Sequence, residues 1–138
     1  MTKHILVAYD GSAPAERAFD FALTLARALE ADVYVLAVAR PPEPPEEVET
    51  EAVLESATEH FEQQFATLRQ RVSGTGLSAR FEVAVGHPAE QIVYQAERQR
   101  IDHIVMGHRG NTFFQRWLLG SVCKQVIDHA PCTVTVVR

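Results

Sequence analysis

The amino-acid sequence predicts an α/β fold, a doubly wound sandwich in which helices cover both faces of a five-stranded parallel sheet. Five short apolar runs alternate with four segments of helical period along the chain. Strands that alternate with helices pair in parallel through right-handed crossovers. The second run is apolar over all of residues 33–39, which is typical of a strand buried on both faces.

The first strand is predicted over residues 5–8, and it ends at the turn-forming sequence Tyr9-Asp10-Gly11-Ser12. A helix is predicted over residues 14–30, because Pro14 suits a first helical turn and apolar residues then recur at every third or fourth position. The second strand covers residues 33–39. The remaining strands are predicted over residues 81–85, 104–106 and 134–137, with helices over roughly 88–99 and 121–129 between them.

A Pro/Glu-rich loop is predicted over residues 40–50, because four of the seven prolines fall there. Neither a helix nor a central strand tolerates that density of proline, so we expect an extended surface loop. The helix that follows is predicted over roughly residues 48–72. Apolar residues recur there at helical spacing, and glutamates occupy the other face.

The 138 residues fit a single domain, residues 1–138, and 46% hydrophobic with 22% charged residues is an ordinary globular composition. No apolar run approaches the ~18 residues of a membrane span, and the first run is too short for a signal-peptide core. Cys123 and Cys132 make no disulfide framework and are expected to pack as small apolar residues. We therefore expect a cytoplasmic protein.

Charge is distributed unevenly along the chain. The net charge of −5 makes the molecule a poor general binder of nucleic acid, whose phosphates must be neutralised. No acid lies between Asp102 and Asp128, where Arg109, Arg116 and Lys124 give the segment +3 and leave −8 for the rest of the chain. The sequence thus predicts neither a nucleic-acid nor a membrane partner, but it allows a small anion at this basic segment.

Three glycines in the basic segment form the pattern Gly107-x-x-Gly110, nine residues, Gly120-Ser121. Glycines let backbone N–H groups approach an anion closely, and the first turn of the helix that begins at Ser121 offers further N–H groups and the positive end of a dipole. These features predict a phosphate cradle. The alternative is that the glycines only turn the chain and start a helix. Neither the P-loop motif nor the dinucleotide motif is present.

Asp10 is the only acid in the loop after the first strand. Beside a nucleotide it could bind Mg²⁺ directly or through water, or it could accept a hydrogen bond from a ribose hydroxyl. The alternative is an ordinary Asp-Gly turn. The two loops reinforce each other, because a doubly wound sheet can place the first and fourth strands side by side where the strand order reverses.

Taken together, these motifs resemble the universal stress protein family over the whole length of the chain. The resemblance rests on Gly107-His108-Arg109-Gly110 followed by Gly120-Ser121-Val122, on the opening residues 5–12, and on residues 85–88, 102–107 and 131–137. The long Gly/Ser motif is the mark of the ATP-binding branch of that family. Two positions depart from the common pattern, with Ala8 in place of proline and His108 in place of serine or threonine.

The resemblance implies a Rossmann-like sheet of strand order 3-2-1-4-5, ATP binding, and homodimers that form through the C-terminal strand, residues 133–137. Asp10 is then expected at the ribose or at the metal-bound phosphates, with Mg²⁺ held directly or through water. Val38 and Met106 are expected to border the adenine. The predicted binding set is Ala8, Asp10, Val38, Met106, Gly107, Arg109, Gly110, Gly120, Ser121 and Val122.

Three functions follow from these features. The first is an ATP-binding regulatory protein of the stress response, a dimer whose interactions with other proteins change with its nucleotide state. The second is a slow ATPase or nucleotidyl-transfer enzyme, for which the sequence shows no clear general base and His108 is the best candidate. The third is a nucleotide-free interaction module that uses its edge strand and the region of Trp117.

Overall fold

The computed structural model describes residues 2–42, 47–108 and 119–138. Every predicted strand and helix is confirmed, with ends that differ by at most two residues from the predicted ones. In chain order the elements are β1 (His4–Ala8), α1 (Ala13–Leu29), β2 (Asp32–Ala39), α2 (Glu47–Val72), β3 (Ala79–Val85), α3 (Pro88–Arg98), β4 (His103–Gly107), α4 (Ser121–His129) and β5 (Thr133–Val137).

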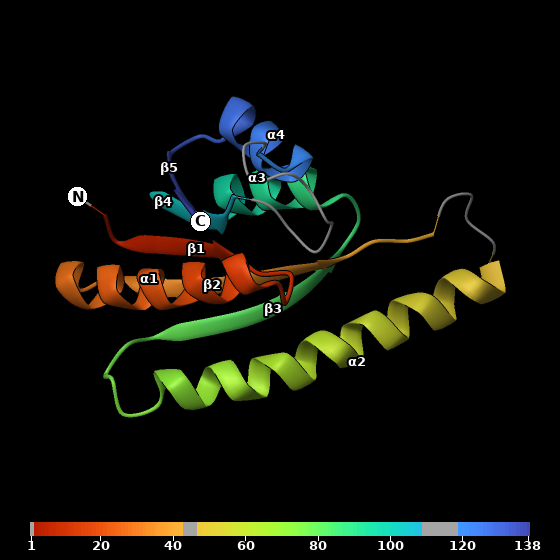
Figure 1. The fold of residues 1–138 in the computed structure, drawn as a ribbon, viewed down its shortest axis with the longest axis horizontal. Helices are drawn as coiled ribbons and strands as arrows, with labels where there is room; N and C mark the ends of the chain where they lie inside the picture. The colour runs from red at the N-terminus through yellow and green to blue at the C-terminus, as the bar shows by residue number, and fades with distance from the viewer. Residues whose placement is uncertain (1, 43–46, 109–118) are drawn as a thin grey trace.

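The five strands form one parallel sheet in the order β3-β2-β1-β4-β5, which is the order that the family resemblance implied. Helices α1 and α2 cover one face of the sheet and α3 and α4 cover the other (Figure 1). The strand order reverses between β1 and β4. Ala8, the last residue of β1, pairs with Leu36 of β2 on one side and with Met106 of β4 on the other.

Two apolar cores lie on the two faces of the sheet, because successive side chains along a strand point to opposite faces. Ile5 and Val7 of β1 lie in the core beneath α1 and α2, whereas Leu6 lies in the core beneath α3 and α4. All three side chains are fully buried. The nearly continuous apolar runs in the sequence have their physical cause here, since both faces of β1 and β2 must be apolar.

Helix α2 is tied to α1 by a charged network at its C-terminal end. Arg71 donates to Glu16 over 2.6 Å, also pairs with Asp20, and stacks its guanidinium 4.8 Å from the centre of the Phe19 ring. The Tyr9 hydroxyl donates to the same Glu16. Burial and the hydrogen bond to Glu16 raise the pKa of Tyr9, so the hydroxyl remains a neutral donor at physiological pH. The network therefore fixes Tyr9, which immediately precedes Asp10.

The Pro/Glu-rich loop is shorter than predicted. The prediction extended it to residue 50, but α2 already begins at Glu47. The last proline of the segment is Pro45, and the glutamates that follow favour a helix and suit its N-terminal end. Residues 43–46 of the predicted loop lie outside the described residues.

Candidate functional site

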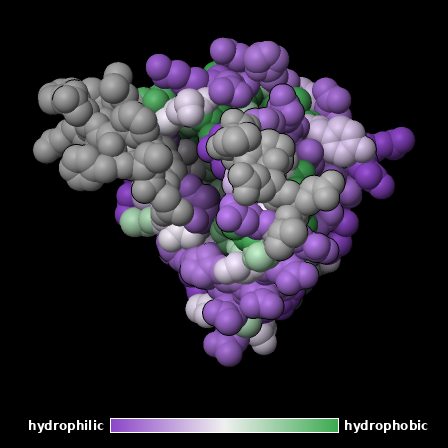
Figure 2. Space-filling view, turned by 90° about the vertical axis from the view of Figure 1, so that its right-hand side faces the viewer, coloured by the Kyte–Doolittle hydropathy of each residue, from purple (hydrophilic) through white to green (hydrophobic). Residues whose placement is uncertain are grey.

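A cavity of about 320 Å³ lies at the carboxyl ends of β1, β2 and β4, where the strand order reverses. This is the place where open α/β sheets bind their ligands. At this end of the molecule, hydrophobic residues show in hollows of an otherwise largely hydrophilic face (Figure 2). The lining residues are Ala8, Tyr9, Asp10, Ser12, Ala15, Leu36, Val38, Arg40, Phe61, Pro88, Ile92, Met106, Gly107, Gly120, Ser121, Val122 and Cys123.

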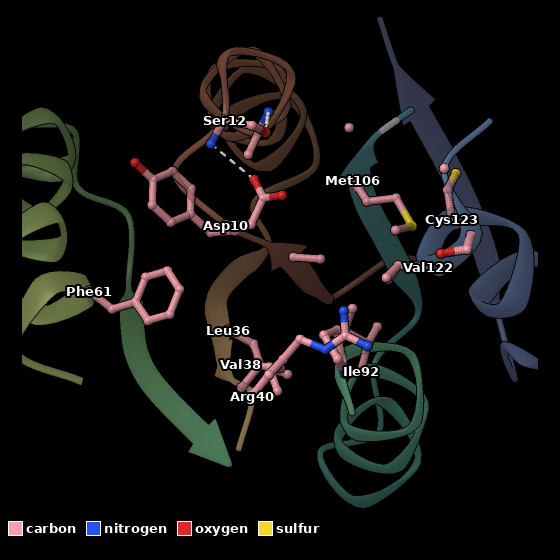
Figure 3. Close-up of a pocket in the computed structure, with 17 residues that line it drawn as sticks. Asp10, Ser12, Leu36, Val38, Arg40, Phe61, Ile92, Met106, Val122 and Cys123 are labelled. Atoms are coloured by element: carbon pink, nitrogen blue, oxygen red, sulfur yellow. Dashed lines mark hydrogen bonds between the residues drawn. The ribbon is translucent and has the colours of Figure 1, made fainter. Parts of the chain in front are cut away.

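The walls of the cavity are mainly apolar and come from both faces of the sheet. Figure 3 shows Leu36 and Val38 of β2 and Ile92 of α3 on one side, with Met106 of β4 opposite. Phe61 reaches the cavity from α2, which lies on the other face of the sheet. A flat apolar group that enters the cavity would therefore contact apolar side chains from several elements.

Asp10 is held in place by the turn that leads into α1. The Ser12 backbone N–H donates to Oδ1 of Asp10 at 3.0 Å, the contact drawn as a dashed line in Figure 3. The Ser12 hydroxyl in turn accepts from the Ala15 N–H at 3.2 Å and so caps α1. The predicted Asp-Gly turn is thus present, and the same turn presents the Asp10 carboxylate to the cavity.

Among the described residues, no side chain caps the N-terminus of α4. Its N-cap is Gly120, whose own N–H donates to the His108 carbonyl at 2.8 Å. The first intrahelical bond runs from the Lys124 N–H to the Gly120 carbonyl at 3.1 Å. The N–H groups of the three residues between them therefore have no acceptor within the helix. These residues, Ser121, Val122 and Cys123, all line the cavity, where the helix dipole favours an anion.

Gly107 lines the cavity, but its lack of a side chain has a packing cause. A Cβ at this position would lie 2.7 Å from Cβ of Pro14 and 3.0 Å from the Pro14 carbonyl carbon. The last residue of β4 therefore packs directly against the first turn of α1. This close approach brings the loops after β1 and β4 together at the cavity.

The peptide groups of β2 alternate between its two neighbouring strands. The Tyr9 N–H donates to the Leu36 carbonyl at 2.9 Å, and the Gly86 N–H donates to the Ala39 carbonyl at 3.0 Å. The N–H and C=O of Leu36 therefore point toward β1, and those of Ala39 point toward β3. Because backbone groups alternate in direction along a strand, the N–H and C=O of Val38 point to the β1 side. The register between β1 and β2 ends at Ala8 and Leu36, so the Val38 N–H and C=O lie beyond the last pair, and Val38 lines the cavity.

Most of the residues predicted as a binding set lie together in this cavity. The ones that line it are Ala8, Asp10, Val38, Met106, Gly107, Gly120, Ser121 and Val122. Arg109 and Gly110 lie outside the described residues, as do Arg116 and Trp117. Sequence reasoning missed Arg40, Phe61 and Ile92. Arg40 directly follows a predicted strand, and Asp10 lies two residues after another. A charged residue just beyond the carboxyl end of a strand was the signal in the sequence that could have identified Arg40.

His108 does not line the cavity. Its side chain is buried, and its backbone N–H donates to the Val137 carbonyl at 2.8 Å as a continuation of the β4–β5 pairing. A general base must reach its substrate, so this position does not support the hypothesis of a catalytic His108. Cys123 is buried and Cys132 partly buried, and burial raises the pKa of both thiols, in line with the predicted packing role.

The described residues contain neither a metal-binding cluster nor a helix that could span a membrane. Among residues 2–42, 47–108 and 119–138, no group of three or more metal-ligating side chains gathers. None of the described helices is both long and apolar enough to cross a bilayer. Within the described part of the chain, the cavity at the strand ends thus remains the best-formed candidate.

Comparison with known proteins gives a consistent result. The whole chain, residues 1–138, matches the universal stress protein family model. It is 34% identical over 140 residues to universal stress protein MJ0531 of Methanocaldococcus jannaschii, with 99% of this chain and 82% of that protein covered. A universal stress protein of Thermus aquaticus is 36% identical over 140 residues, with both chains fully covered.

Solved structures agree with the fold. Universal stress protein UspA from Lactobacillus plantarum superposes with a TM-score of 0.92 at 28% identity, over 99% of this chain and 98% of that one. A universal stress protein in complex with cAMP has a TM-score of 0.68 at 22% identity, with 99% and 97% coverage. One from Archaeoglobus fulgidus in complex with dAMP has a TM-score of 0.69 at 23% identity, with 100% and 98% coverage. At 22% and 23% identity, the likeness to the cAMP and dAMP complexes shows a shared fold only.

Proposed function

We propose that this chain, which belongs to the universal stress protein family, binds an adenine nucleotide in the cavity at the strand ends. The nucleotide that we expect foremost is ATP. One observation carries this proposal. Three backbone N–H groups at the N-terminus of α4 have no acceptor within the helix, and their residues line the same cavity as an apolar slot and the Asp10 carboxylate. A nucleotide combines the matching parts, namely an anion, a flat apolar base and a sugar with hydroxyl groups.

The base fits the end of the cavity formed by β2. Val38 offers one N–H donor and one C=O acceptor side by side, and adenine carries the complementary pair, the acceptor N1 and the donor amino group at position 6. Leu36, Ile92 and Met106 supply apolar contacts to the faces of the ring. The cAMP and dAMP complexes of two proteins with the same fold are precedents for an adenine nucleotide.

The phosphates fit the opposite end, at α4. The N–H groups of Ser121, Val122 and Cys123 can donate to phosphate oxygens, and the exposed Ser121 side chain adds a hydroxyl donor. Asp10 is the only carboxylate among the described lining residues. It can accept from a ribose hydroxyl or take part in holding Mg²⁺, which would otherwise be coordinated by phosphate oxygens and water.

Titration calorimetry of the purified protein with ATP in the presence of Mg²⁺ tests this proposal. We expect a dissociation constant on the order of 1 mM or tighter. We expect CTP to bind more weakly, because its single-ring base is smaller and makes fewer apolar contacts with the walls of the cavity. Titration with ATP in EDTA measures the share of the affinity that depends on the metal. The proposal fails if protein freed of any co-purified nucleotide binds neither ATP, cAMP nor dAMP.

We further propose that the chain forms a homodimer through β5, which is an edge strand of the sheet among the described residues. The Val137 carbonyl accepts a hydrogen bond from the His108 N–H at 2.8 Å, so the backbone groups of Val137 point toward β4. Because these groups alternate in direction along a strand, the N–H and C=O of Val136 point away from the sheet. An exposed strand edge of this kind pairs readily with another chain.

Changing Val136 to proline is expected to shift a dimer to the monomer. Proline lacks the outward N–H that a partner strand needs, whereas the bonds of neighbouring residues to β4 are kept. Analytical ultracentrifugation over a range of concentrations measures the effect, with Val136→Ile as a control that keeps the N–H. A monomeric parent protein, or a proline variant with an unchanged dimer dissociation constant, would rule out this interface.

The regulatory role is part of the same proposal. The cavity is bounded by Phe61 of α2 on one face of the sheet and by Ile92 of α3 on the other. A bound nucleotide would therefore contact helices on both faces and could change the surface that they offer to a partner protein. A role in the stress response and a cytoplasmic location remain predictions that accompany this function.

A further inference from the structure

Arg40 occupies the base end of the cavity. It directly follows Ala39, the last residue of β2, and it continues the row formed by Leu36 and Val38 on one face of the strand. Figure 3 shows its side chain turned toward the cavity, which Ile92 of α3 also lines. Asp10 and Arg40 are the only charged side chains among the described lining residues, and they stand at different ends of it.

The guanidinium is available for a ligand as far as the described residues are concerned. Within residues 2–42, 47–108 and 119–138, no hydrogen bond or ion pair engages Arg40, whereas Arg71 is held by Glu16 and Asp20. A guanidinium offers five N–H donors in one plane and no acceptor. Any group that it meets in the cavity must therefore present acceptor atoms.

The Val38 peptide orients a purine relative to Arg40. The C=O of Val38 lies on the C-terminal side of its N–H, and it is therefore the nearer of the two groups to Arg40 along the chain. Adenine on this edge places N1 at the N–H and its amino group at the C=O. Its next polar atom in the same direction is N7, which is an acceptor. Arg40 is thus the donor-bearing side chain on the N7 side of the base.

We propose that Arg40 determines base specificity by donating to N7 of the bound purine. This inference rests on the proposed nucleotide site and adds a residue that reads the base there. Pyrimidines have no N7 and lose the contact. A site that offers a donor discriminates against an analogue that lacks the acceptor, because the donor then gives up its water without a partner.

The test compares ATP with 7-deaza-ATP, in which a C–H replaces N7 and the rest of the nucleotide is kept. We expect the parent protein to bind ATP about three- to tenfold more tightly than 7-deaza-ATP in calorimetry, the effect of one partly exposed charged hydrogen bond. In Arg40→Ala we expect the two dissociation constants to agree within about twofold. Arg40→Lys keeps a donor and is expected to retain part of the preference.

Arg27→Ala is the matched control, since it removes the same charge from the exposed face of α1. It measures how far loss of a distant positive charge weakens the binding of a polyanion, and it should leave the ratio of the two constants unchanged. Circular dichroism and thermal unfolding establish that Arg40→Ala, a change at an exposed residue, is folded. The proposal is overturned if the ratio is the same in the parent and in Arg40→Ala. If the parent binds no nucleotide at all, the proposed function itself has failed.

Discussion

Gly120→Val is expected to weaken the binding of ATP by about 100-fold or more and to leave the fold intact. Gly120 is buried at the N-cap of α4, beside the three N–H groups assigned to the phosphates. An isopropyl group there would occupy the space that the phosphates need and separate them from the donors. A 100-fold loss corresponds to about 2.7 kcal/mol, within the range for the loss of one or two hydrogen bonds to a charged group.

The backbone at Gly120 allows this substitution. Its φ of −64° and ψ of 153° lie in the β region, which valine adopts without strain. Valine is a poorer N-cap than glycine, so the free energy of unfolding should fall by only about 1 kcal/mol. Far-ultraviolet circular dichroism and thermal unfolding of the nucleotide-free protein measure that change. Calorimetry with ATP measures the affinity.

Ala130→Val is the control for the same helix. Ala130 is the C-cap of α4, with nearly the same backbone conformation (φ −62°, ψ 138°), but it lies at the end away from the cavity. We expect this variant to bind ATP as the parent does. If Gly120→Val bound ATP as tightly as Ala130→Val, the phosphates could not lie at the N-terminus of α4, and the cavity would have to hold its ligand in another way.

The sequence was sufficient to predict the fold because both faces of the inner strands are covered. A strand such as residues 33–39, apolar at every position, can be stable only inside a sheet with helices on both sides. Proline and glycine then marked the ends of the elements, and most predicted ends fell within one residue. The end of the Pro/Glu-rich loop was placed too late, at residue 50, since glutamate-rich sequence after Pro45 is compatible with a helix as well as with a loop.

Residue roles at the site were harder to predict, because they depend on atoms that face one another only in the folded chain. Gly120 was predicted as a member of the binding set, yet its N–H is bonded to the His108 carbonyl, so the N–H groups without an acceptor in the helix begin at Ser121. Val38 lines the cavity, but the direction of its peptide depends on the register of β2 between its neighbours. Arg40 became recognisable only when the side chains of β2 could be assigned to one face of the sheet.

The positively charged segment of the sequence lies partly at the candidate site. The acid-free segment of residues 103–127 ends in α4, and Lys124 is exposed on that helix. Arg109 and Arg116 lie outside the described residues, so in the described part of the proposed phosphate end an anion would meet mainly backbone N–H groups and a helix dipole. Such a site suits one small polyanion and gives no broad basic face, which agrees with a net charge of −5.

Gly107→Val is expected to destabilise the folded state itself, by about 2–4 kcal/mol, whether or not a nucleotide is present. Even the Cβ would lie 2.7 Å from Cβ of Pro14, 3.0 Å from its carbonyl carbon and 3.1 Å from the Ala15 nitrogen. Two of these three atoms belong to the backbone of α1, and Gly107 is itself fixed in the sheet by its pairing with Val137. Neither side can move away without breaking hydrogen bonds, so the added atoms must strain the packing of β4 on α1.

Thermal unfolding of the nucleotide-free protein separates this packing role from a role in ligand binding. At about 4 °C per kcal/mol for a domain of this size, we expect Gly107→Val to lower Tm by about 8–16 °C and Gly107→Ala to lower it by less. Pro14→Gly removes one of the three close atoms, so Gly107→Ala should cost less in that background than in the parent. A glycine required only for contact with the nucleotide would give a different result, with the Tm of the nucleotide-free protein unchanged in Gly107→Ala. Because the close contact exists without any ligand, the loss of stability should appear before nucleotide is added, and weaker binding of ATP should follow from it.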